Sequence, residues 1–84
     1  MNTSIPDSTL NTLDMYVHHR TRTGGFLQSV LENDLMGAVE KADKYNRLAL
    51  ADIVQYIFNE MPMGCWGSPE AVEDWLSGKT QLEN

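Results

Sequence analysis

The chain has 84 residues, 42% of them hydrophobic, and a formal net charge of −6, which together indicate one small globular domain. It has no apolar run near the ~20 residues of a membrane span, and its first residues lack the basic and apolar regions of a signal peptide. The negative charge argues against general binding to the backbone of DNA or RNA, which requires a broad basic face. We therefore expect a cytosolic protein with a single helical domain over residues 1–84 and flexible ends at 1–6 and 79–84.

Hydrophobic spacing predicts an all-α fold, a small bundle of three to four helices without strands. The first helix is expected to begin at Asp7 or Ser8, either of which can cap it, and to end near Arg20. The second is expected to begin near Gly25. Its apolar residues keep helical spacing on one side as far as Ala42, and the weak helix formers Asn33, Asp34 and Gly37 predict a bend in its middle.

A third helical segment is expected from Asp43 to about Glu60, and the sequence leaves open whether a break separates it from the second helix. Its apolar residues cover more than one stripe. Such a helix is either deeply buried or shared with another chain. Because so few short helices are available to cover it, we expect a subunit interface and hence a homo-oligomer, which a charge at Ile57 should dissociate.

Pro62 ends that segment, because the residue before a proline is disfavoured in a helix. Ser68-Pro69-Glu70 predicts the start of a last helix, which Gly78 ends. Cys65 is the only cysteine, so an intramolecular disulfide is excluded. It lies among methionines and a tryptophan, which favours a small buried thiol over a nucleophile.

The most unusual stretch connects the first two helices and reads His18-His19-Arg20-Thr21-Arg22-Thr23-Gly24-Gly25-Phe26. Between Met15 and Leu31 there is no Asp or Glu, although the chain has 12 acidic and only 6 basic residues. Thr23 and the glycines fall at the start of a helix, where free N–H groups and the positive end of the dipole collect. Backbone amides, a hydroxyl and two guanidinium groups would converge there, as they do in phosphate and anion sites.

A simpler interpretation remains open at this stretch. Two glycines between helices form a turn without any ligand, and Arg or His suits the negative end of the preceding helix. Tyr16 precedes Arg20 by one helical turn, so the two side chains can share a face. That face either stacks on a base and binds a phosphate, or it packs Tyr16 against the edge of the core.

A second and weaker basic patch consists of Lys41, Lys44 and Arg47. Acidic residues accompany it, so an ordinary salt-bridged helix surface is the more common explanation. His18 and His19 are adjacent and point in different directions on a helix, so they do not hold one metal ion together. No legible acid-base or nucleophilic set is present. We expect a non-enzymatic protein that uses neither a metal nor a cofactor.

Four short stretches resemble a group of small phage proteins. They are Thr-Gly-Gly-Phe-Leu at 23–27, Val-Leu-Glu-Asn-Asp-Leu at 30–35, Ala-Asp at 42–43 with Asn46, and Pro62 followed by Cys-Trp-Gly-Ser at 65–68. Within this group the chain is similar to the anti-CBASS sponges, which sequester the cyclic oligonucleotide signals of bacterial immunity. The likeness spans about Tyr16 to Trp75.

The resemblance implies a compact all-helical protomer that assembles into a hexamer from two trimers in the cytoplasm of the infected bacterial host. It implies that cyclic dinucleotides bind between protomers and cyclic trinucleotides in separate pockets, without cleavage. It also implies ligand contacts from an aromatic ring and a basic side chain near the first two helices. Tyr16 and Arg20 are the candidates, although Arg stands where Lys is expected. The whole candidate site is Tyr16, Arg20, Arg22, Thr23, Gly24, Gly25 and Phe26.

Composition fits a competing hypothesis equally well. A small acidic phage protein can mimic nucleic acid and inhibit a host nuclease or polymerase by direct protein contact. The acid-free window favours a ligand pocket, whereas the acidic C-terminal stretch favours the mimic.

Overall fold

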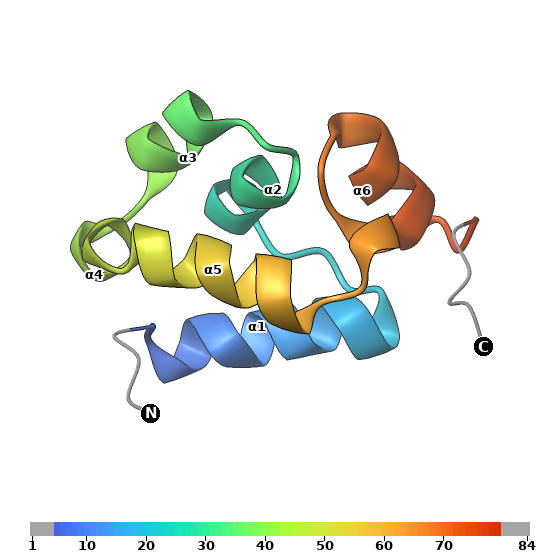
Figure 1. The fold of residues 1–84 in the computed structure, drawn as a ribbon, viewed down its shortest axis with the longest axis horizontal. Coiled ribbons are helices and arrows are strands. Elements are labelled where there is room, and N and C mark those ends of the chain that lie inside the picture. The colour runs from blue at the N-terminus through green and yellow to red at the C-terminus, as the bar shows by residue number, and fades with distance from the viewer. Residues whose placement is uncertain (1–4, 80–84) are drawn as a thin grey trace.

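The computed structural model describes residues 5–79, and this part of the chain is entirely helical apart from turns and connections. The helices are α1 (Asp7–His19), α2 (Gly25–Leu31), α3 (Leu35–Lys41), α4 (Lys44–Leu48), α5 (Leu50–Glu60) and α6 (Pro69–Leu76), with a 3-10 turn, η1 (Met63–Cys65), before the last. In Figure 1, α1 lies along the bottom of the view with α5 above it, and α3, α2 and α6 lie above α5. None of the described helices is long and apolar enough to cross a membrane.

The expected second helix, Gly25 to Ala42, is in fact two helices. Asn33 has φ 66°, a left-handed conformation that asparagine tolerates better than most residues, and it ends the first of them. Asp34 then caps α3, because its carboxylate accepts a hydrogen bond of 3.1 Å from the N–H of Gly37. The prediction of one continuous helix was wrong at this point.

The expected third segment is also divided. Asp43 caps α4 by accepting a 2.8 Å hydrogen bond from the N–H of Asn46, so a break does separate it from α3. Ala49 interrupts the helical path again before α5 begins. The fold class is therefore all-α as predicted, but the described residues form six α-helices rather than three to four.

The first and last predicted helices are confirmed, but the predicted cap of the first is wrong: Asp7 and Ser8 lie within α1, and Pro6 precedes it without a side-chain cap. α1 ends at Arg20, whose φ of 53° is left-handed and whose N–H bonds back to the carbonyl of Tyr16. α6 begins as the sequence predicts, with the Ser68 hydroxyl accepting a 3.1 Å hydrogen bond from the N–H of Ala71 and with Pro69 in the first turn.

One hydrophobic core joins these helices. Its largest side chains with less than 2% exposure are Trp75, Tyr16, Leu13, Leu31 and Ile53. Cys65 is buried among them, as expected for a small structural thiol. Of the ends that were expected to be flexible, residues 1–4 and 80–84 lie outside the described residues, whereas Ile5 belongs to the core.

Candidate functional site

Tyr16 of α1 and Arg20, which follows the last residue of α1 with a left-handed backbone, both pack against Trp75 of α6. The Tyr16 ring is 1% exposed, lies 6.4 Å from the Trp75 ring, and donates its hydroxyl to the carbonyl of Cys65 at 2.8 Å. The Arg20 guanidinium lies over Trp75, 3.9 Å from the ring centroid, and donates a 2.8 Å hydrogen bond to the Trp75 carbonyl. Tyr16 and Arg20 thus act on the same aromatic ring, but that ring is the indole of Trp75 and not the base of a bound nucleotide.

Burial of this cluster also suppresses its acid-base chemistry. Desolvation raises the pKa of the Tyr16 hydroxyl well above its usual range, and it raises the pKa of the Cys65 thiol to about 11. Both groups are therefore neutral near pH 7. In this protomer Tyr16 presents no ring face to a ligand, so its contribution is to the fold.

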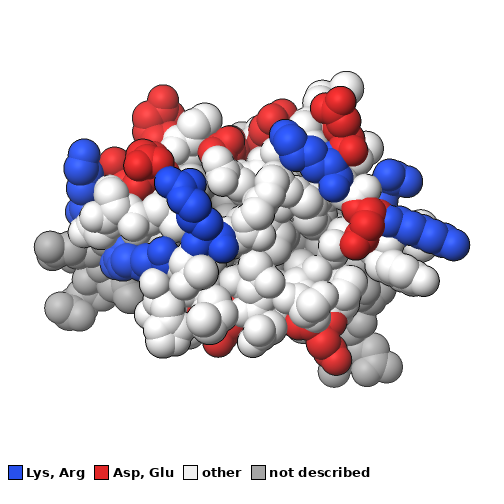
Figure 2. All heavy atoms as spheres, turned by 180° about the vertical axis from the view of Figure 1, so that it is seen from behind, with Lys and Arg blue, Asp and Glu red and all other residues white. Residues whose placement is uncertain are grey.

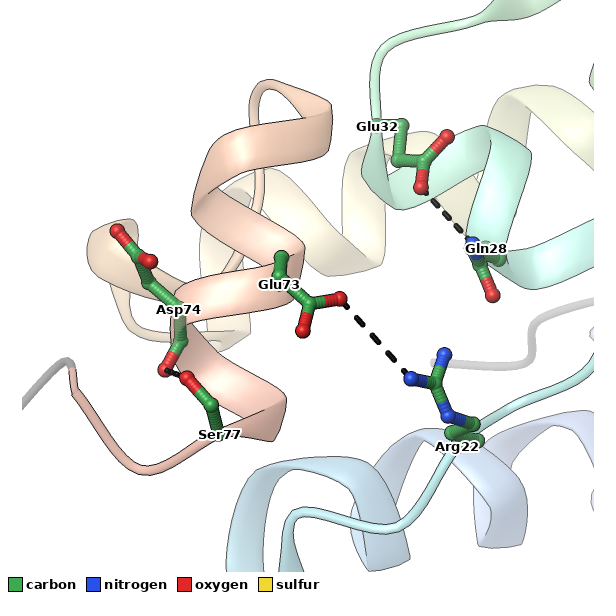
Figure 3. Close-up of polar contacts among 6 residues, drawn as sticks. All are labelled: Arg22, Gln28, Glu32, Glu73, Asp74 and Ser77. Atoms are coloured by element: carbon green, nitrogen blue, oxygen red, sulfur yellow. Dashed lines mark hydrogen bonds and ion pairs between the residues drawn. The ribbon is translucent and has the colours of Figure 1, made fainter.

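The segment between Met15 and Leu31 contains no acidic residue, but acidic residues from elsewhere in the chain lie beside it. Figure 3 shows Arg22, from the connection between α1 and α2, pointing toward Glu73 of α6, with 3.9 Å between the nearest nitrogen and oxygen. His18 lies 3.3 Å from Asp14, one turn earlier on α1. The side chains of both pairs are more than half exposed, so these interactions are weak and Arg22 and His18 keep access to solvent.

The remaining candidates, Thr23 to Phe26, line a polar hollow of about 280 Å³. α1 supplies the opposite wall through hydroxyl side chains, and the start of α4 supplies an amide. The hollow is lined by Ser8, Thr9, Thr12, Thr23, Gly24, Gly25, Phe26, Leu27 and Asn46. We call this the polar hollow. Its lining contains no charged side chain.

Hydrogen bonds hold much of this wall in place. The Thr9 hydroxyl donates to the amide oxygen of Asn46 at 2.7 Å, and the Thr12 hydroxyl donates to the Ser8 carbonyl at 2.8 Å. Gly24 has φ 95°, which favours glycine over other residues. At Gly24 and Gly25 the wall of the hollow is therefore bare backbone.

Lys41 lies against Gly25, one of the residues that line the polar hollow. A Cβ atom built on Gly25 would lie 3.2 Å from Cδ of Lys41, so the lysine stem runs against this glycine. Its ammonium group donates a 3.2 Å hydrogen bond to the hydroxyl of Ser29 on α2. On the face shown in Figure 2, a central uncharged and hollowed surface has cationic side chains on both sides.

The three residues of the second predicted patch make different contacts. Lys41 associates with α2, whereas Arg47 donates a 3.1 Å hydrogen bond to the carbonyl of Ala42, and Lys44 begins α4. Sequence reasoning missed Ser8, Thr12 and Asn46. The signal for the first two was present, because hydroxyl residues four apart share one face of a helix.

Comparison of the chain with protein-family models, with curated proteins and with solved structures finds no significant match.

Proposed function

We propose that the chain is a non-enzymatic phage protein that binds and sequesters cyclic di- and trinucleotide messengers in the bacterial host, and so blocks CBASS signalling. The resemblance of the short stretches to anti-CBASS sponges motivates the proposal. The observation that carries it is the polar hollow, which gathers Thr23, Gly24, Gly25 and Phe26 in a chain of net charge −6.

The chemistry of the hollow suits one part of such a ligand. Lys41 offers a charge-assisted contact to a phosphodiester, and the glycines allow the ligand to approach the backbone closely. Hydroxyl groups from Ser8 and Thr23 match the hydroxyl and ring-nitrogen groups of a nucleoside. Phe26 adds an apolar wall.

The volume of about 280 Å³ is slightly below the ~300–1,000 Å³ of typical small-molecule pockets. A cyclic dinucleotide would therefore extend beyond one protomer and be covered by a second copy. This is consistent with the self-assembly, up to a hexamer, that the resemblance implies. The proposed site thus keeps Thr23–Phe26 and adds Lys41, whereas Arg22 points toward Glu73 and Tyr16 and Arg20 pack against Trp75.

A thermal-shift screen against cyclic dinucleotides, cyclic trinucleotides and their linear counterparts tests the proposal. A ligand that binds only the folded state raises the melting temperature as its concentration exceeds the Kd. We expect a shift with cyclic ligands and recovery of the intact ligand after denaturation. Absence of any shift, or recovery of a cleaved product, would contradict sequestration.

A second candidate function is direct inhibition of a host protein. α6 favours it, because Glu70 and Glu73 present exposed carboxylates on one helix. If this function is correct, Glu70→Lys with Glu73→Lys abolishes the inhibition, and cyclic nucleotides have no effect on the melting temperature.

A further inference from the structure

Helix α5 carries two apolar stripes. Ile53 and Ile57 are 0% and 4% exposed and face the core, whereas Val54 and Phe58 are 45% and 68% exposed. The two-sided character expected from the sequence is therefore present, but Ile57 belongs to the inner side. A charge there would disrupt the core and would not report on an interface.

The outer stripe combines a projection with a depression. Phe58 projects, with its ring 5.8 Å from that of Trp66. Ala51, two turns earlier on the same stripe, contributes only a methyl group to a hollow that Leu35, Leu48 and Val54 also line and that Phe58 itself borders at the other end of the stripe. Leu35 and Leu48 are 59% and 76% exposed, so the walls of this depression are apolar side chains in solvent.

We infer that a second copy of this chain covers the stripe, with the two α5 helices antiparallel about a two-fold axis. In this arrangement Phe58 of each copy fills the depression over Ala51 of the other. The two-fold axis then passes between residues 54 and 55, midway between Ala51 and Phe58. It therefore also places Val54 of one copy against Gln55 of the other. A two-fold contact must be self-complementary, and a projection and a depression on one stripe meet that requirement.

Charge selects the same orientation. Arg47, which lines the depression, lies at the amino end of the stripe, and the exposed Glu60 lies at the carboxyl end. Antiparallel packing brings Arg47 of one copy near Glu60 of the other, whereas parallel packing would place like charges together. Unlike charges at the rim of an interface favour the correct register.

This inference specifies the self-assembly within the proposed function and is tested without ligand. A second apolar hollow adjoins the depression over Ala51, and Val30, Ala38 and Trp66 are among the residues that line it. The polar hollow shares no lining residue with either of them. Failure of the assembly and failure of nucleotide binding are therefore separate results.

Sedimentation velocity of the ligand-free chain over a range of micromolar concentrations measures the dimer Kd. We expect the wild type to dimerise and Phe58→Asp to raise the Kd by about 30-fold or more, the effect of losing an interface anchor worth about 2 kcal/mol. Met36→Asp is the matched control, because Met36 is 81% exposed and lines neither apolar hollow. Circular dichroism checks that each variant is folded.

Exchanging the charges of Arg47 and Glu60 tests the antiparallel dimer even where Phe58→Asp fails to fold. Arg47→Glu and Glu60→Arg should each weaken the dimer, and the double variant should recover most of the wild-type affinity. Recovery requires that the two residues meet across a self-contact. A monomeric wild type, a dimer that tolerates Phe58→Asp, or a double variant no better than the singles would overturn the inference, as would a monomer whose stripe binds a different protein.

Discussion

The indole N–H of Trp75 donates a 2.8 Å hydrogen bond to the backbone carbonyl of Tyr16, 59 residues earlier in the chain. The two side chains also pack with their rings 6.4 Å apart. This pair fastens the last helix to the first. The aromatic and cationic residues that resemble a ligand site in the sequence thereby become part of the core, and stability can be altered there separately from binding.

Substitution of Trp75 tests the fastening. Trp75→Ala should lower the free energy of unfolding by roughly 3–5 kcal/mol, the range for a large buried aromatic. Trp75→Phe should cost less in packing but remove one of the two hydrogen bonds to the Tyr16 carbonyl, which keeps the bond from the Arg20 N–H, and this adds about 0.5–1.5 kcal/mol. Urea denaturation measures both values.

Trp66→Phe is the matched control for that pair. The indole nitrogen of Trp66 is buried without a hydrogen-bond partner, so removing it breaks no bond and relieves an unpaired donor. Trp66→Phe should therefore cost clearly less than Trp75→Phe. Equal costs would contradict the role assigned to the hydrogen bond from Trp75 to Tyr16.

Replacing Arg20 should lower the free energy of unfolding more than replacing Arg22. Arg20→Ala removes a charge-assisted hydrogen bond and the contact over Trp75, at a cost near the lower end of ~1.5–3 kcal/mol because the residue is partly exposed. Arg22→Ala removes only an exposed ion pair with Glu73, worth less than about 1 kcal/mol. Thermal unfolding with circular dichroism measures the difference, and an equal loss in both variants would refute it.

The buried thiol predicts alkaline instability. The unfolded Cys65 loses its proton near its ordinary pKa of 9.0, whereas burial raises the folded pKa to about 11. The folded state therefore binds more protons between these values, and the free energy of unfolding falls as pH rises from about 9 to 11, with the contribution complete below pH 9. Tyr16, whose pKa is raised by burial too, adds a further loss above pH 10.

Urea denaturation at several pH values measures this slope, and Cys65→Ala should make it shallower. The native thiol should also resist a thiol reagent at pH 8, whereas the chain in urea reacts. Rapid labelling of the folded protein would show that Cys65 is accessible and would contradict the buried position.

The sequence predicted the all-α class, the bounds of α1 and the start of α6, because local signals determine all three. Ser68 and Pro69 act within their own turn, and the apolar spacing of α1 is unambiguous. The breaks at Asn33 and Ala49 were not predicted. Asn33 has a weak helix preference, but alanine is the best helix former, so neither preference nor apolar spacing locates the break at Ala49.

The candidate site was predictable only in part. Thr23 to Phe26 follow from the turn chemistry of two glycines before a helix, and these residues do line one hollow. The burial of Tyr16 depends on Trp75 and Cys65, which lie 59 and 49 positions further along the chain. The neighbours of Arg22 and Lys41 are also set by tertiary packing. Helical spacing predicts a shared face for Tyr16 and Arg20 but not the side on which the core lies.

Calorimetric titration of cyclic di- and trinucleotides into wild type, Lys41→Gln and Lys44→Gln tests the central claim most directly. Both variants remove one exposed lysine charge, but only Lys41 runs against Gly25 beside the polar hollow. We predict saturable binding that Lys41→Gln weakens by roughly 10- to 150-fold, the loss of one charge-assisted contact of ~1.5–3 kcal/mol. Lys44→Gln should remain within a few-fold of wild type. Absence of binding in the wild type, or equal weakening in both variants, would contradict a nucleotide site at the start of α2.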